Sequence, residues 1–135
     1  MAINYCDSKT EEELSWHLVG DVEILKSKQC RKIFMKEGPL LALFCVAPDR
    51  FFLTDTSCPH AGGPLDQGDI EDIDGSVRVV CPLHDYSFDL VTGKSPSGLV
   101  LTTYQTEIRD QQVYALTPRS ISLTKFEDMK VIKLC

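Results

Sequence analysis

Short apolar runs separated by turn residues follow one another along the first half of the chain. Residues 31–36 and 40–46 form two such runs with a Gly-Pro turn between them, and residues 51–54 return after a second turn at 48–50. Runs of this length, rich in aliphatic and aromatic side chains and bounded by Gly, Pro and Asp, are typical of β-strands. The pattern therefore predicts antiparallel strands joined by tight connections.

The same pattern continues in the second half of the chain. Residues 76–80 form a further apolar run, residues 86–91 are predicted to form a strand, and residues 107–116 are predicted to form a hairpin. No convincing amphipathic helix and no internal repeat interrupts the series. Many short strands at even spacing indicate an all-β protein, a sandwich or a small barrel. Trp16, in an early apolar stretch, is expected in its core.

Length and charge narrow the class of protein. The chain has 135 residues, enough for one domain, and no apolar run approaches the ~18–20 residues of a membrane-spanning helix. Its net charge of −6 argues against nucleic-acid and membrane-surface partners. The N-terminus shows no pattern of a secretory signal, so the six cysteines are expected as free thiols in a cytoplasmic, reducing compartment.

Two blocks combine cysteine with histidine. The first reads Cys58-Pro59-His60 and the second Cys81-Pro82-Leu83-His84, with twenty residues between His60 and Cys81. One thiolate and one imidazole from each block make a matched set of four metal ligands. Such a set suits a two-iron cluster in which one iron is held by both thiolates and the other by both imidazoles.

Two other interpretations of the blocks stay open. Zinc accepts the same four ligands in a structural Cys2His2 domain, although its sites usually pair Cys with Cys and His with His. A redox or iron–sulfur sensor, or an interaction module, is the other open interpretation of the blocks. An oxygenase built on such a cluster would need a second iron site with two further histidines, and only His17 remains in this chain.

The two blocks, the Phe88-Asp89 and Thr92-Gly93 pairs and the closing hairpin resemble the Rieske-type 2Fe-2S ferredoxin family over residues 16–118. Residues 68–75 and 129–133 are most similar to the soluble Rieske-domain-containing proteins of animals. The resemblance implies an antiparallel β-sandwich with a smaller cluster-binding subdomain formed by two loops. It implies that Cys58 and Cys81 hold the inner iron of one 2Fe-2S cluster, and that His60 and His84 hold the outer iron at the protein tip.

The resemblance also sets the expected organisation and function. Residues 1–13 are expected to be a lead-in, residues 14–118 the Rieske domain, with its cluster-binding part at about 54–92, and residues 119–135 a C-terminal extension. The implied function is that of a soluble one-electron carrier rather than an enzyme. It would take electrons from a flavoprotein or other reductase and pass them to an oxygenase or other redox protein.

Differences from the Rieske proteins of respiratory complexes suggest a low reduction potential. Those relatives clamp the loops with a disulfide at the positions of Gly63 and Leu83, and carry Ser and Tyr hydroxyls at those of Tyr86 and Phe88. Without such hydrogen-bond donors the reduction potential is expected toward the low end of the range. The acidic residues 66–74 are also expected to favour a low reduction potential. They are expected to form a solvated loop, or alternatively a docking surface for a basic partner.

Overall fold

The computed structural model describes residues 13–46, 49–59, 62–73, 75–83 and 86–126. The regular secondary structure of these residues is almost entirely β-strand. In chain order the elements are β1 (Ser15–Asp21), α2 (Val22–Leu25), β2 (Cys30–Met35), β3 (Leu40–Val46), β4 (Arg50–Asp55), η1, a 3-10 turn (Leu65–Gln67), β5 (Asp69–Ile73), β6 (Ser76–Val80), β7 (Ser87–Asp89), β8 (Thr103–Tyr104), β9 (Thr106–Arg109), β10 (Gln112–Thr117) and β11 (Ile121–Ser122).

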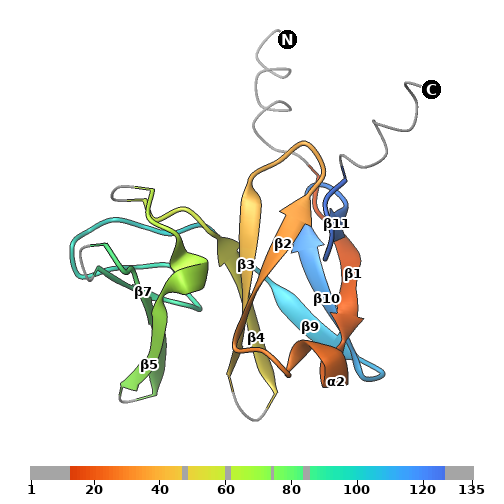
Figure 1. Cartoon of the computed structure of the whole chain (residues 1–135), viewed down its shortest axis with the longest axis horizontal. Coiled ribbons are helices and arrows are strands. Elements are labelled where there is room, and N and C mark those ends of the chain that lie inside the picture. The colour runs from red at the N-terminus through yellow and green to blue at the C-terminus, as the bar shows by residue number, and fades with distance from the viewer. Residues whose placement is uncertain (1–12, 47–48, 60–61, 74, 84–85, 127–135) are drawn as a thin grey trace, which may run out of the picture.

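The strands form three antiparallel sheets. A five-stranded sheet has the order β11-β2-β3-β4-β8, and two three-stranded sheets have the orders β1-β10-β9 and β5-β6-β7. Figure 1 shows β2, β3 and β4 in the middle, with β1, β9 and β10 on one side and β5 and β7 on the other. The prediction of an all-β fold of antiparallel strands is confirmed.

The central strand β3 is buried on both of its faces. Successive side chains of a strand point to opposite faces, so Leu41 and Leu43 lie on one side of the sheet and Ala42 and Phe44 on the other. The first pair belongs to a core shared with β1 and β10, the second to a core shared with β6 and β7. This explains why residues 40–46 read as a continuous apolar run rather than an alternating one.

The acidic stretch at residues 66–74 departs from the expected solvated loop. Asp69 to Ile73 form β5, whose residues pair with β6, Ile70 opposite Val79 and Asp72 opposite Val77. Half-buried Ile70 packs against the core, while Asp69, Glu71 and Asp72 are exposed. The run is therefore an edge strand, and its charges mark the strand face and edge that meet water.

Trp16 is not in the core, contrary to the sequence expectation. In β1 the fully inward position is taken by Val19, and Trp16 lies half-buried on the outer face of the sheet. The guanidinium of Arg109 lies 5.0 Å from the centre of the Trp16 ring and 5.0 Å from that of Tyr114. Cation–π contacts of this kind account for a large aromatic ring at an outward position.

The short helix α2 and the turn η1 are the helical elements of the described residues. Neither was predicted, because a helix of three or four residues is too short to show a helical repeat of apolar positions. No helix in the part of the chain that the structure describes is long and apolar enough to cross a membrane.

Candidate metal centre

Cys58 and Cys81 are the two predicted ligands that the structure describes, and both thiols are buried in the core between β3 and the β5-β6-β7 sheet. Cys58 lies three residues after β4, and Cys81 directly follows β6. Their exposed fractions are 2% and 1%. The chain after β4 and the chain after β6 thus each carry one cysteine into the same core.

Backbone hydrogen bonds close the loop that follows Cys58. The Cys58 N–H donates to the carbonyl oxygen of Gly63 at 2.9 Å, and the Gly62 N–H donates to that of Cys58 at 2.7 Å. Ser57 and Pro64 form an isolated β-bridge just outside these bonds. The ends of this loop are therefore fixed to each other by backbone hydrogen bonds.

The loop that follows Cys81 is closed in a similar way. The Cys81 N–H donates to the carbonyl oxygen of Tyr86 at 2.7 Å. Directly beyond this bond, Val80 of β6 pairs with Ser87 of β7. The second loop is thus the connection of a hairpin whose two strands hold its ends together.

Gly63 joins the two loops. It is bonded to Cys58 as described, and a Cβ atom added to it would lie 2.8 Å from the Sγ of Cys81 and 3.0 Å from side-chain atoms of Leu83. A Cβ atom essentially never comes so close to another heavy atom, so a glycine is required for the two loops to meet here.

Side-chain hydrogen bonds hold the first loop onto the sheet. The buried hydroxyl of Thr56 donates to Asp66 Oδ1 at 2.9 Å, and the Leu65 N–H donates to the Thr56 carbonyl oxygen at 2.8 Å. Sequence reasoning did not identify this pair, because several carboxylates follow the loop and the sequence alone does not say which one Thr56 reaches. Thr56 thereby supports the loop from the strand side.

The Phe88-Asp89 and Thr92-Gly93 pairs form the turn behind the second loop. Asp89 Oδ1 accepts hydrogen bonds from the Val91 and Thr92 N–H groups at 2.7 and 3.0 Å, and Oδ2 accepts one from Ser76 at 2.9 Å. Burial alone would raise the pKa of Asp89, but these bonds and the charge of Arg78 lower it. Asp89 therefore holds this turn as a carboxylate.

Gly93 completes that turn. Its φ is +80°, and an added Cβ atom would overlap the carbonyl oxygen of Leu101. The Leu101 N–H donates to the Gly93 carbonyl oxygen at 2.7 Å, so the two segments lie too close together for a side chain at residue 93. Glycine also adopts the left-handed backbone that this turn requires. The motif thus fixes the segment after β7 against the segment that leads to β8.

His60 and His84, the other two predicted ligands, lie outside the described residues. Among the residues that the structure does describe, no three His, Cys, Asp or Glu side chains come together as a metal site. The described half of the site is a pair of buried thiols on two adjoining loops. Thiolates are the usual ligands of iron–sulfur clusters, so the residues present fit such a group.

Comparison with known proteins identifies the family. The family model for soluble Rieske-type ferredoxins matches residues 18–117. The chain belongs to this family. Rieske-type ferredoxins carry an iron–sulfur cluster and transfer electrons, so the prediction of an electron carrier rather than an enzyme is confirmed at the level of the family.

Individual relatives of this Rieske-type ferredoxin agree with that assignment. The chain is 35% identical to the 3-phenylpropionate/cinnamic acid dioxygenase ferredoxin subunit of Photorhabdus laumondii over 104 residues, which cover 75% of this chain and 93% of the relative. It is 55% identical to the human Rieske domain-containing protein over 40 residues, 30% of this chain. That match spans only 26%, about a quarter, of the human protein.

A solved structure supports the fold of the Rieske-type ferredoxin. A chain from the complex of reduced oxygenase and oxidized ferredoxin in carbazole 1,9a-dioxygenase superposes with a TM-score of 0.62. The superposition covers 75% of this chain and 92% of that chain at 24% sequence identity. At this identity the likeness shows a common fold.

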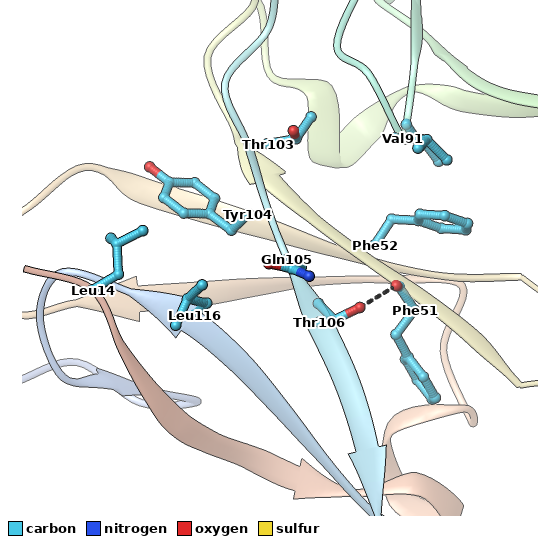
Figure 2. Close-up of a pocket in the computed structure, with 10 residues that line it drawn as sticks. Leu14, Phe51, Phe52, Val91, Thr103, Tyr104, Gln105, Thr106 and Leu116 are labelled. Atoms are coloured by element: carbon cyan, nitrogen blue, oxygen red, sulfur yellow. Dashed lines mark hydrogen bonds between the residues drawn. The ribbon is translucent and has the colours of Figure 1, made fainter.

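A separate apolar groove of about 540 Å³ lies away from the cysteines of this ferredoxin. Figure 2 shows Phe51 and Phe52 of β4 on one side of it and Leu14, Leu116 and Tyr104 on the other, with Gln105 and Thr106 between them. The groove is lined mainly by apolar side chains and hydroxyl groups, which do not form a catalytic arrangement.

Proposed function

We propose that this chain is a one-electron carrier whose 2Fe-2S cluster is held by Cys58, His60, Cys81 and His84. The observation that carries the proposal is that Gly63, whose carbonyl oxygen accepts from the Cys58 N–H, lies against the Cys81 thiol, and that both thiols are buried, in a chain that matches the Rieske-type ferredoxin family. When bound, such a cluster supplies reversible one-electron exchange at a single centre.

The described residues support the protein part of this task. Cys58 and Cys81 are shielded from water by the core around them, and the loop closures fix both of their backbones. Phe88 is fully buried and offers no hydroxyl group. Because hydrogen bonds to the cluster and its ligands raise the potential, an apolar Phe88 supports a potential toward the low end of the Rieske range.

We assign the ferredoxin to an electron-transfer chain between a reductase and an oxygenase or other redox protein. The support comes from its relatives, since one is a dioxygenase ferredoxin subunit and a solved structure of the same fold belongs to an oxygenase–ferredoxin complex. The donor, a flavoprotein or other reductase, is proposed from the family alone. We also propose a cytoplasmic location, since Cys30 and Cys45 are free thiols and a reducing compartment keeps thiols in that form.

The first test is the spectrum of the anaerobically purified protein, with iron and sulfide quantified. Two irons, two sulfides and a Rieske-type rhombic EPR signal after dithionite reduction are expected. Bound zinc without a signal would contradict the proposal and leave a structural zinc domain.

The ligand assignment needs its own test. His84→Cys is expected to lower the reduction potential, because a thiolate adds a negative charge to the centre in place of a neutral imidazole. The matched control is Cys45→Ser, which changes a half-buried thiol packed against the other core. An unchanged potential in the His84 variant would remove His84 from the ligand set.

A further inference from the structure

The side chain of Leu83 lies at the place where the two loops meet. Its exposed fraction is 52%, yet Gly63, which lies against it, is buried. A Cβ atom added to Gly63 would lie 3.0 Å from both Cγ and Cδ1 of Leu83, so the leucine side chain rests directly on the backbone of the first loop. One side of Leu83 therefore covers that backbone, and the other side meets water.

The thiol of Cys81 lies under the same contact. The point at which a Gly63 Cβ atom would stand is 2.8 Å from Cys81 Sγ as well as 3.0 Å from Leu83 Cδ1, so the sulfur and the leucine border the same point. Cys81 is only 1% exposed, whereas Pro82 and Leu83 are both exposed. The sulfur is thus buried close to the surface, and Leu83 stands at that surface.

The first loop is covered in this way only at the junction. A Cβ atom added to Gly62 would find nothing within 4 Å among the described residues, and Gly62 and Pro64 are both exposed. Gly63, between them, is buried, and Cys81 and Leu83 supply its nearest contacts. The cover is therefore specific to the point where the backbone of one loop meets the thiol of the other.

An exposed leucine needs no special explanation in most proteins. Leu18 of β1 is such a residue here, with an exposed fraction of 47% in the sheet that packs on the other core. Leu83 differs because its buried side lies against Gly63, in the loop that follows Cys58, and beside the Cys81 thiol. The two leucines are alike in size and exposure and differ in what they cover.

We propose that Leu83 is a hydrophobic cover that keeps water from the Cys81 sulfur and thereby holds the reduction potential of the bound centre down. The inference rests on the proposed function, because it takes Cys81 as a ligand. Reduction adds one negative charge to a Rieske centre, and hydrogen bonds to its sulfurs and exposure to solvent tune its potential. The apolar shell around a metal site acts on the potential by controlling the access of water.

The test is a redox titration of the purified holoprotein, followed by the EPR signal of the reduced centre. Leu83→Asn puts a polar side chain at the junction, and Leu83→Ala opens the junction to water, so both should raise the potential. Leu83→Met keeps an apolar side chain of similar volume and should keep the potential of the unmodified protein. An unchanged or lowered potential in the loaded Asn and Ala variants would overturn the inference, as would an equal rise in the Met variant.

The rate at which the centre is lost gives a second measurement. Leu83→Ala should speed the bleaching of the visible absorption in excess EDTA by roughly fivefold or more, because the part of the leucine that is buried no longer covers the junction. Leu18→Ala is the matched control and should bleach at the rate of the unmodified protein. Equal acceleration in both variants would overturn the inference, since the effect would then not come from the junction.

Iron and sulfide are quantified in every preparation. An unmodified protein without iron and sulfide would overturn the proposed function and this inference with it. Loaded Leu83 variants with the potential and the bleaching rate of the unmodified protein would overturn this inference alone.

Discussion

A Cβ atom added to Gly63 would lie 2.8 Å from the Sγ of Cys81, so the backbone of one loop touches the thiol delivered by the other. Gly63→Ala must therefore push the two loops apart. We expect a clear loss of iron and sulfide per protein, measured chemically after anaerobic purification.

The control for that variant is Gly20→Ala, whose added Cβ atom would meet Leu25 at an ordinary contact distance of 3.5 Å. It should retain the metal content of the unmodified protein. Full metal content in Gly63→Ala would show that the loops can separate without consequence for the site.

Asp89 should stabilise the turn behind the second loop. Asp89→Ala removes acceptors for two backbone N–H groups and for the Ser76 hydroxyl. A loss of about 1–3 kcal/mol in the free energy of unfolding is expected at pH 7, measured by urea denaturation. Ser76→Ala removes one of these bonds and should cost less; an equal loss in both variants would place the main effect at Ser76.

Asp55 and Tyr104 should make stability depend on pH. Burial raises the pKa of Asp55 above its ordinary value, and the Tyr104 hydroxyl, which donates to Asp55 Oδ1 at 2.8 Å, offsets part of that rise. The folded state then binds the proton more tightly than the unfolded state, so this group's contribution to stability falls as pH rises from about 3.8 through the raised pKa.

Tyr104→Phe removes the donor, so it should raise the pKa of Asp55 further. The resulting loss of stability should be larger at pH 7 than at pH 5, because the charged carboxylate is the form that lacks its partner. Tyr114→Phe, which breaks only a 3.4 Å hydrogen bond to Gln112, is the control. A loss that is larger at pH 5 would contradict this account.

Cys30 and Cys45 should differ in reactivity and should not form a disulfide with each other. Cys30 packs with the core on one face of the five-stranded sheet and Cys45 with the core on the other. Burial, together with the charge of Asp66, raises the pKa of Cys30 to about 12. At pH 8 only about one Cys30 in ten thousand is a thiolate, the form that reacts.

Alkylation with iodoacetamide at pH 8, followed by mass spectrometry, should therefore label Cys45 before Cys30. In guanidinium chloride the two rates should become similar, because unfolding removes the burial that raises the pKa. Equal rates in the folded protein would contradict the difference in surroundings.

The strands were predictable where apolar residues and turn residues alternate in the sequence. Residues 31–36 correspond to β2 within one residue at each end, residues 40–46 coincide with β3, and residues 107–116 lie within the β9-β10 hairpin. The edge strand β5 was missed because its exposed carboxylates resemble a solvated loop, while pairing with β6 is a long-range property that local charge does not reveal.

The candidate site was predictable in its residue types and only partly in its construction. The spacing of Cys58 and Cys81 from their histidines indicated a metal site, and the structure brings both thiols into one core. The contact of Gly63 with Cys81 and the bond from Thr56 to Asp66 depend on how distant segments pack, which a single sequence does not show. The roles of His60 and His84 stay predictions.

Because β3 contributes alternate side chains to both cores, the half of the fold that contains Cys58 and Cys81 has no separate interior. Phe44 is as much a part of that interior as Val79 or Phe88, although it belongs to the central strand of the five-stranded sheet. This half is therefore not expected to fold when it is separated from the five-stranded sheet.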